Sequence, residues 1–169
     1  MSVLAALTLP AELTTPDGDL LVRGAEPADL DALIALIAAD PVSAARGDTA
    51  DDDDKAVYAR ALEALQADPS NVQLVAERGG EVVATLQLTL IPGLSRRGAT
   101  RLQVETVRVR DDLRSAGIGR TLMRWVGEVA PTLGAQLIQL TSDAERVHAH
   151  RFYERLGYEA SHVGYKLTV

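Results

Sequence analysis

The segment Arg114-Ser115-Ala116-Gly117-Ile118-Gly119 constrains the fold more than any other part of this 169-residue chain. It follows a stretch, 101–109, whose composition is typical of a β-strand, and it precedes apolar residues at three- and four-residue spacing. That spacing predicts an amphipathic helix over 117–128. The two glycines therefore lie in a tight connection from strand to helix, where the backbone can approach a ligand closely.

This connection has the features of a phosphate-binding loop. The first turn of a helix carries unpaired N–H groups and the positive end of the helix dipole, and both favour an anion. Arg110, Arg114 and Arg120 flank the loop, and guanidinium groups bind phosphate oxygens in pairs. Two nucleotide-binding motifs do not fit. Leu122 stands where the dinucleotide fingerprint needs a third Gly or Ala, and the Gly-Lys-Ser/Thr of nucleoside-triphosphate loops is absent.

The sequence Arg-x-x-Gly-x-Gly, preceded by Val107 and Val109, resembles the signature of the GNAT superfamily of N-acetyltransferases. The resemblance runs from about Leu20 to the C-terminus and is strongest over 103–123 and 149–158. In the second range, Ala-His-Arg-Phe-Tyr-Glu-Arg-Leu-Gly-Tyr is similar to the family's second conserved helix, and a shorter similarity points to the aminoalkylphosphonate acetyltransferase branch. The resemblance implies the GNAT fold, acetyl-coenzyme A as cosubstrate and a homodimer.

The resemblance also implies roles for individual residues. Tyr153 corresponds to the tyrosine of the family's Phe-Tyr pair, which donates a proton to the coenzyme sulfur; the alternative is a core aromatic. Glu105 corresponds to a base that acts directly or through water, or else makes a structural hydrogen bond or ion pair. Arg146 stands where the family frequently has an Asn that contacts the coenzyme. The implied coenzyme contacts are Val107, Arg108, Val109, Arg114, Ser115, Ala116, Gly117, Ile118, Gly119, Arg120, Thr121 and Phe152.

The predicted central strand changes the face on which its apolar residues lie. By alternation, Leu102 and Val104 share one face, whereas Val107 and Val109 share the other, so the phase slips near Glu105. A β-bulge produces such a slip, and a strand buried on both faces is the alternative. The resemblance implies that the bulge parts this strand from its neighbour, that the pantetheine arm lies between them and that a backbone N–H polarises the thioester. We expect Glu105 to be partly buried there, which would favour a base.

Composition is typical of one enzyme domain, with 47% hydrophobic and 24% charged residues. We expect a single domain over 20–169 after an N-terminal extension, 1–19. Short apolar runs and a start without basic residues predict a cytoplasmic protein that does not bind membranes. Since Cys is absent, any acyl transfer must avoid a cysteine intermediate, and we expect direct transfer. His148 and His150 fall on different faces of a helix, so we expect no metal site.

Charge is unevenly distributed along the chain. The formal charge of −7 argues against a nucleic-acid partner. Within 94–124, however, eight arginines minus three carboxylates give a local charge of +5, which suits the strongly anionic coenzyme A. The run of four aspartates at 51–54 has two interpretations: a solvated helix start, or an attraction for a cationic amine acceptor.

Hydrophobic periodicity predicts alternating elements. Residues 71–77 and 81–91 should form an antiparallel hairpin through Arg78-Gly79-Gly80. A helix that opens at Glu26-Pro27 should close at Pro41, another should span 51–66, and Ser142-x-x-Glu145 should cap the last helix, which Gly157 ends. Further strands are expected over 20–23 and 136–141, with one or two in the tail 158–169. The predicted class is α/β (α+β): a mixed, mostly antiparallel central sheet of six to seven strands flanked by about four helices.

These features together predict an acetyl-coenzyme A-dependent N-acetyltransferase. It would transfer the acetyl group within a ternary complex to a primary amine of a small molecule. The sequence does not identify that acceptor. The alternative is a regulatory module of the same fold that binds an acyl-coenzyme A without turnover.

Overall fold

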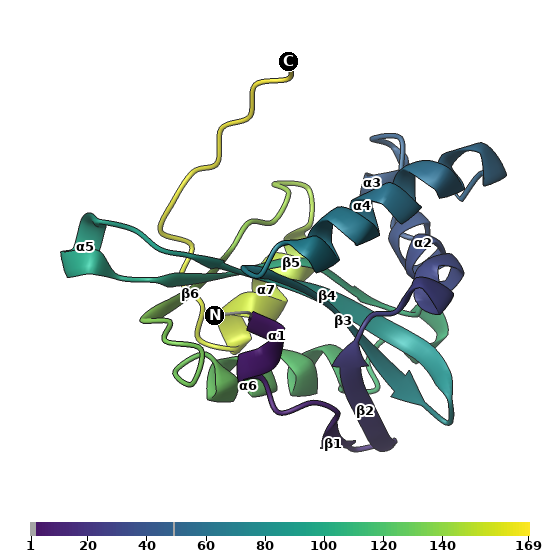
Figure 1. The fold of residues 1–169 in the computed structure, drawn as a ribbon, viewed down its shortest axis with the longest axis horizontal. Helices are drawn as coiled ribbons and strands as arrows, with labels where there is room; N and C mark the ends of the chain where they lie inside the picture. The colour runs from purple at the N-terminus through teal and green to yellow at the C-terminus, as the bar shows by residue number, and fades with distance from the viewer. Residues whose placement is uncertain (1–2, 49) are drawn as a thin grey trace.

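The computed structural model describes residues 3–48 and 50–169. A six-stranded sheet runs through the molecule in the order β1-β2-β3-β4-β5-β6, with helices on both faces (Figure 1). Neighbouring strands are antiparallel except β5 and β6, which are parallel. The strands are β1 (Ala11–Thr15), β2 (Gly18–Gly24), β3 (Asn71–Arg78), β4 (Glu81–Ile91), β5 (Arg101–Val109) and β6 (Leu137–Leu140).

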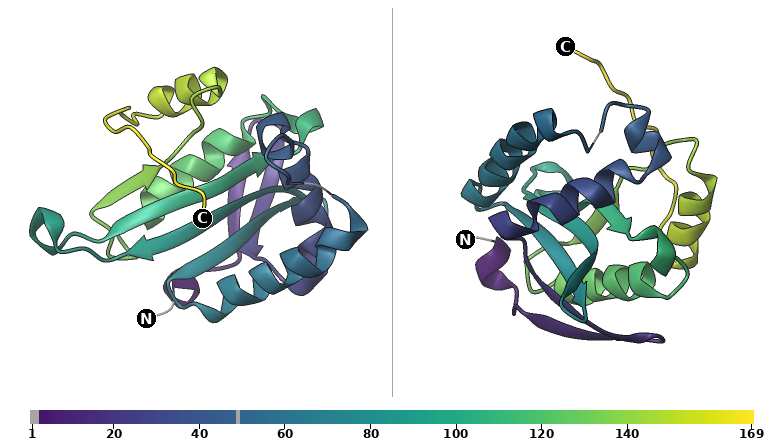
Figure 2. Two further views of the ribbon diagram at one scale, coloured as in Figure 1. Left: turned by 90° about the horizontal axis from the view of Figure 1, so that it is seen from above. Right: turned by 90° about the vertical axis from the view of Figure 1, so that its right-hand side faces the viewer.

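Helices α2 and α4 cover one face of the sheet, while α6, α7 and the short α1 lie on the other (Figure 2). Within the described residues, no helix is long and apolar enough to cross a membrane. The helices are α1 (Val3–Ala6), α2 (Leu30–Ala38), α3 (Pro41–Ala44), α4 (Lys55–Ala67), α5 (Ser95–Gly98), α6 (Ile118–Val129) and α7 (Val147–Arg155), with 3-10 turns η1 (Pro27–Asp29), η2 (Asp52–Asp54) and η3 (Asp111–Leu113).

The main apolar core lies between the sheet and α6. Leu86 and Leu102 of the sheet and Leu122 and Val126 of α6 are completely buried in one cluster. Burying such side chains stabilises the fold by roughly 1.5–3 kcal/mol each, so α6 is held firmly against β5. On the opposite face, Val75 belongs to a smaller cluster with residues of α2 and α4. The start of α6, which carries the predicted loop, is therefore anchored to the sheet.

The predicted fold class is confirmed. The sheet is mixed and mostly antiparallel, and four of its helices have nine or more residues. Strands β3 and β4 form the predicted hairpin, and Gly79 and Gly80 have φ angles of 61° and 83° in its turn. These left-handed angles favour glycine, which has no Cβ to clash with the backbone. Strand β5 has the predicted bounds.

Two N-terminal predictions need correction. No strand was expected before residues 20–23, but β1 lies upstream of them and pairs with β2. Pro41 was expected to close a helix. Instead α2 ends at Ala38, and Pro41 opens α3 after Asp40, whose carboxylate accepts a 2.9 Å hydrogen bond from the Ser43 N–H. Proline is favoured at a first helical position because its missing N–H would have no partner there.

Two C-terminal predictions are wrong. The Ser142-x-x-Glu145 capping box does not form, since α7 begins only at Val147 and Arg146 precedes it without a side-chain cap. The expected final strands are also absent, because residues 159–169 form neither helix nor strand. This tail leaves the body of the molecule (Figure 1), and its alternating apolar residues are exposed. A strand needs a partner for its backbone groups, and the tail has none within the described chain.

Candidate active site

Strand β5 contains the predicted bulge. Thr85 of β4 lies opposite Arg108, and Gln87 lies opposite Glu105, so a step of three residues on β5 faces a step of two on β4. One residue is therefore extra on β5. Thr106 carries the distortion, with a φ of 51° that is rare for a β-branched residue. Strain of this kind costs of order 1–3 kcal/mol and is concentrated at functional sites.

Beside the bulge, β5 loses its parallel neighbour. Pairing with β6 covers four positions and stops where Val104 faces Leu140, the last residue of β6. From Glu105 to Val109 the strand continues along β4 alone, so the backbone groups on its other edge have no strand partner among the described residues. This exposed edge is where an extended ligand could pair with the backbone.

The loop before α6 leads away from the end of β5. Ser115 and Gly117 have φ angles of 71° and 80°, so the chain turns sharply twice before α6 begins at Ile118. The N–H of Thr121 donates to the Gly117 carbonyl, but those of Gly119 and Arg120 have no acceptor among the described residues. These N–H groups lie at the positive end of a 12-residue helix, an arrangement that favours an anion.

The two loop glycines meet different surroundings. A Cβ built on Gly117 would lie 3.0 Å from the Cδ of Pro16, in the turn between β1 and β2. One on Gly119 would lie 3.5 Å from Phe152 and 3.8 Å from Val109. These are ordinary contact distances, so the start of α6 lies close to α7 and β5, and three segments with predicted coenzyme contacts come together.

The arginines around this loop are mostly paired in the absence of ligand. Arg110 forms ion pairs of 2.7 and 2.9 Å with Asp112 and Glu81, and Arg114 pairs with Asp111. The Arg114 and Asp111 side chains are more than half exposed, and exposed ion pairs of this kind contribute only about 0–1 kcal/mol. A phosphate could displace such a carboxylate at little cost.

The other coenzyme contacts implied by the resemblance occupy the same neighbourhood. Ile118 is buried, whereas Ser115 and Arg120 are exposed. The intermediate positions are Val107, Val109, Ala116, Gly117, Gly119, Thr121 and Phe152.

Tyr153 lies in an aromatic group on α7. Its ring packs edge-on against Phe152 and Tyr158, with centroids 5.1 and 5.8 Å away, and both Phe152 and Tyr153 contact the main core. Its hydroxyl has no hydrogen-bond partner among the described side chains. Burial raises the pKa of the Tyr153 phenol above its ordinary value of 10.0, although the positive charges of Arg108 and Arg146 oppose this shift. The phenol is thus protonated at neutral pH and has a proton to donate.

Glu105 does not have the environment expected from the sequence. It lies next to the bulge, as predicted, but it is exposed rather than partly buried. The reason is the end of β6 at Leu140, because no neighbouring strand covers β5 beyond Val104. Its role as a base stays a prediction, and water has free access to its carboxylate.

A cluster of polar side chains lies where α3, β5 and the segment before α7 meet. It includes Arg108, which the resemblance implies as a coenzyme contact, and Arg146, but the sequence did not predict that these side chains come together. Arg108 donates through Nη2 to the Ser43 hydroxyl at 2.8 Å and through Nη1 to the Val107 carbonyl at 3.0 Å. Arg146 forms a 2.5 Å ion pair with Asp40 and reaches the Ser43 hydroxyl at 3.5 Å. We call Asp40, Ser43, Arg108 and Arg146 the arginine cluster. The pattern Asp40-Pro41-x-Ser43 is typical of a helix start and could have placed Asp40 and Ser43 together from the sequence.

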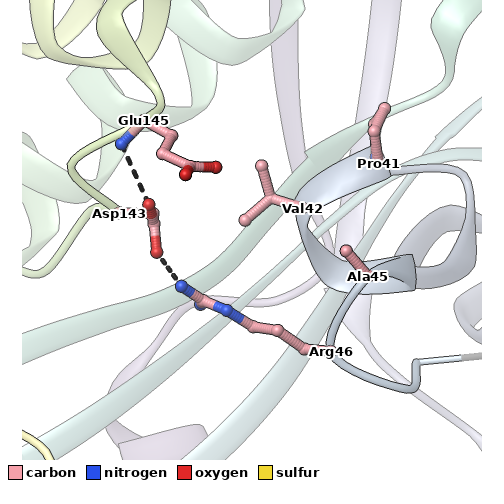
Figure 3. A pocket seen from close by; sticks show the side chains of 6 residues that line it. All are labelled: Pro41, Val42, Ala45, Arg46, Asp143 and Glu145. Atoms are coloured by element: carbon pink, nitrogen blue, oxygen red, sulfur yellow. Dashed lines mark hydrogen bonds and ion pairs between the residues drawn. The ribbon is translucent and has the colours of Figure 1, made fainter.

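A pocket of about 370 Å³ lies beside this cluster, between α3 and residues 143–145 (Figure 3). Arg46 extends across it to pair with Asp143, which also accepts a 2.9 Å hydrogen bond from the Glu145 N–H. Its lining residues are Pro41, Val42, Ala45, Arg46, Asp143 and Glu145. Within residues 3–48 and 50–169, no group of three or more His, Cys, Asp or Glu side chains could hold a metal ion.

Comparison with known proteins agrees with this geometry. The sequence is 35% identical over 95 residues to the aminoalkylphosphonate N-acetyltransferase of Salmonella typhimurium, an alignment that spans 56% of this chain and 61% of that protein. A solved structure described as a transcriptional regulator from Bacillus halodurans C-125 is 37% identical, with a TM-score of 0.84 over 89% of this chain and 99% of that one. Glucosamine-6-phosphate N-acetyltransferase from Arabidopsis thaliana shares the fold, with a TM-score of 0.70 and 18% identity over 88% and 97% of the two chains. Residues 34–158 match the profile described as Acetyltransferase (GNAT) family, and since this is most of the chain, the protein belongs to that family.

Proposed function

We propose that the protein transfers an acetyl group from acetyl-coenzyme A directly to a primary amine of a small molecule, within a ternary complex. The observation that carries this proposal is the position of the bulge in β5. At that point β5 parts from β6. The N–H groups of α6 that have no acceptor among the described residues lie farther along the chain. The protonated Tyr153 lies near Arg108, which follows Thr106 by two residues. Enzymes of the GNAT family use acetyl-coenzyme A as cosubstrate, and the loop suits its pyrophosphate.

The loop residues fit the coenzyme on two grounds. Gly119 places no side chain over the first turn of α6, and the N–H groups of Gly119 and Arg120 have no acceptor among the described residues. We assign the pyrophosphate to the segment from Arg114 to Thr121, and the pantetheine arm to the unpaired edge of β5 at Val107–Val109. Phe152 closes the site from α7 through its contact with Gly119.

In the reaction, the neutral amine attacks the thioester carbonyl, so that a C–N bond forms and the C–S bond breaks. The amine proton passes to water or to Glu105, whose exposed carboxylate lies beside the bulge. Tyr153 donates its phenolic proton to the departing thiolate. Because the chain has no Cys, no acyl-cysteine intermediate can form, which supports direct transfer with both substrates bound at once.

A second candidate function has one observation in its favour. The relative with 37% identity is described as a transcriptional regulator, so this fold could bind an acyl-coenzyme A as a sensor without turnover. The two functions differ in one measurable product, which is free thiol released in the presence of an amine.

A thiol-release screen therefore tests the proposed function. Purified protein and acetyl-coenzyme A would be mixed with aminoalkylphosphonates, amino acids, polyamines, aminoglycosides and peptides with a free N-terminus. The identity to aminoalkylphosphonate N-acetyltransferase places that class first. Turnover that depends on the amine supports the enzyme. Binding of acetyl-coenzyme A in calorimetry without release by any amine would support the sensor instead.

We also propose that the protein is a cytoplasmic homodimer. The support for a dimer is the tail, where the exposed residues Val163, Tyr165, Leu167 and Val169 alternate as in a strand that lacks its partner. Sedimentation of the full chain and of a variant with Tyr165 and Leu167 replaced by Ser would test this. A monomer in both cases would contradict the proposal.

A further inference from the structure

The side chain of Arg108 is poorly paired for its position. It is half-buried, and its Nε is completely buried without a hydrogen-bond partner. Its other nitrogens donate to neutral oxygens, the hydroxyl of Ser43 and the carbonyl of Val107, and no ion pair to it forms within the described residues. Buried donors are nearly always satisfied, and a buried charge without a counter-charge is costly. This half-buried guanidinium therefore keeps a positive charge that no carboxylate contacts within the described residues.

Arg146 brings a second positive charge to the same point. Its Nη2 lies 3.5 Å from the Ser43 hydroxyl that Arg108 also reaches, so both guanidinium groups converge on one oxygen. The charges of both arginines also act on the Tyr153 phenol, and that of Arg146 acts on Arg108. Burial lowers the pKa of Arg108, the charge of Asp40 raises it and that of Arg146 lowers it, with smaller contributions from Tyr153 and Asp48. An anion between the two arginines would relieve their mutual repulsion.

The arginine cluster lies next to the place where we expect chemistry. Arg108 follows the bulge residue Thr106 by two positions on β5, and Tyr153 has Arg108 and Arg146 as its charged neighbours. The pocket in Figure 3 is formed by the same two segments that carry Ser43 and Arg146. A short molecule with its amine at the bulge could therefore place a second group at these arginines.

We propose that the side chains of Arg108, Arg146 and Ser43 bind an anionic group of the acceptor, so that the substrate is a short amine carrying an oxyanion. This inference rests on the proposed function and adds the substrate class to it. Phosphonate, phosphate and carboxylate share the chemistry that two guanidinium forks and a hydroxyl recognise. It also opposes the alternative in which the aspartates at 51–54 attract a purely cationic acceptor.

A matched series of two-carbon amines tests the preference. Each probe carries a second group two carbons from the amine, and this group is an oxyanion in 2-aminoethylphosphonate, O-phosphoethanolamine and β-alanine. It is uncharged in ethanolamine and propylamine, which we call the neutral amines, and the measurement is kcat/KM from thiol release. We expect the best oxyanion amine to exceed both neutral amines by about 10- to 100-fold, as for hydrogen bonds between charged groups. The order among the three oxyanions identifies the headgroup. Equal kcat/KM for charged and neutral amines would overturn the inference while leaving the proposed function intact.

Variants locate the effect. Arg146→Gln should raise KM for the preferred oxyanion amine by at least about tenfold, while kcat/KM for propylamine and the Kd for acetyl-coenzyme A stay within about twofold. Arg108→Gln should raise KM for the oxyanion amine by a similar factor. Arg101→Gln, at the other end of β5, is the control and should change neither value. An equal loss for charged and neutral amines, or weakened coenzyme binding, would show that the arginines serve another role.

Binding without turnover provides a measurement that does not depend on activity. Calorimetry should detect binding of methylphosphonate or inorganic phosphate to the wild-type protein, and this binding should be lost in Arg146→Gln. If no amine is acetylated but this binding is present, the proposed function fails and the anion site remains. If neither ion binds and no oxyanion amine is preferred, the anion site is refuted. Both measurements use the wild-type protein, so this conclusion holds even if Arg108→Gln does not fold.

Discussion

The protein has two arginine-rich regions, and they differ in how their charges are balanced. In the loop before α6, Arg114 is 55% exposed and pairs with Asp111 three residues away in sequence. In the arginine cluster, Arg146 is only 20% exposed and pairs with Asp40, more than one hundred residues away, while Arg108 has no carboxylate partner among the described residues. One region is a solvated surface where the charges pair with near neighbours in sequence. The other is a set of fixed groups that only tertiary packing brings together.

The difference predicts different energetics for the two ligands. Exposed pairs contribute little, so the coenzyme can replace Asp111 at Arg114 with a small loss. The half-buried Arg108 is already desolvated, so an anion that reaches it gains a strong interaction without a further desolvation cost for the protein. We expect the loop to determine the affinity for coenzyme and the cluster to determine the choice of acceptor.

The largest expected effect concerns Tyr153, which has both cluster arginines as neighbours. Tyr153→Phe keeps the ring and its contacts with Phe152 and Tyr158 but removes the proton donor. General acid catalysis is worth about 10²–10⁴ in rate, so kcat should fall by that factor while the Kd for acetyl-coenzyme A is unchanged. Tyr158→Phe is the matched control, since it removes the neighbouring hydroxyl. A fall of less than about threefold in Tyr153→Phe would mean that water protonates the thiolate.

The pH dependence of the same residue follows from the direction of its pKa. Burial is the largest influence on the Tyr153 phenol and raises its pKa above 10.0, although the charges of the two arginines oppose this. Because the protonated phenol is the active form, kcat should fall on the alkaline side only above pH 10. If kcat instead falls between pH 7 and 9 and Tyr153→Phe abolishes that fall, the phenol would be more acidic than the structure implies.

The next effect concerns the loop. Arg114→Ala and Arg120→Ala should each weaken coenzyme A binding by on the order of 1.5–3 kcal/mol, the value for hydrogen bonds to charged groups, without altering the preference among acceptors. Arg124→Ala, about one turn farther along α6 and also exposed, is the control. Gly117 is a poor target, because its φ of 80° and the contact with Pro16 mean that a side chain there would strain the fold itself. Unchanged calorimetric affinity for coenzyme A in both arginine variants would show that the pyrophosphate does not bind at this loop.

These two regions also show what sequence reasoning can reach. The glycine loop, the bulge and the strand β5 depend on residues close together in the chain, so their spacing and alternation were enough to predict them. The arginine cluster joins positions 40, 43, 108 and 146, whose contact depends on how α3 packs against β5. The departure from the family's Asn at Arg146 was visible in the sequence, but its partner Asp40 was not.

The tail and Glu105 mark a second limit. Alternation at Val163, Tyr165 and Leu167 predicted a strand, but alternation describes only the faces of a segment and says nothing about whether another strand is available. Glu105 was expected to be partly buried because it lies beside the bulge, between Val104 and Thr106. Its exposure follows from the short β6, whose end at Leu140 could not be located from composition.

A smaller effect is expected at Asp40, the counter-ion of the cluster. Burial opposes its ionisation, but the Ser43 N–H and the charges of Arg108 and Arg146 outweigh burial and hold the pKa of Asp40 below 3.8, so it is charged at neutral pH. Asp40→Asn keeps the helix cap and frees Arg146, so KM for an oxyanion amine should fall by about two- to fivefold. Asp68→Asn makes the same change in net charge at the end of α4 and is the control. A rise in KM would indicate that Asp40 holds Arg146 in its binding position.

The smallest effect is expected at the aspartates 51–54. The structure places Asp52–Asp54 in a turn at the start of α4, where carboxylates interact favourably with the helix dipole. Asp51 and Asp53 are exposed, and salt screens such charges beyond about 8–10 Å. Replacing both with Asn should therefore reduce the free energy of unfolding by about 0.3–1 kcal/mol per charge at low salt and change KM for an oxyanion amine less than about twofold. If KM for a polyamine instead rises severalfold in this variant, and rises with salt in the wild type, the acidic run guides a cationic acceptor and the preference assigned to the arginine cluster is wrong.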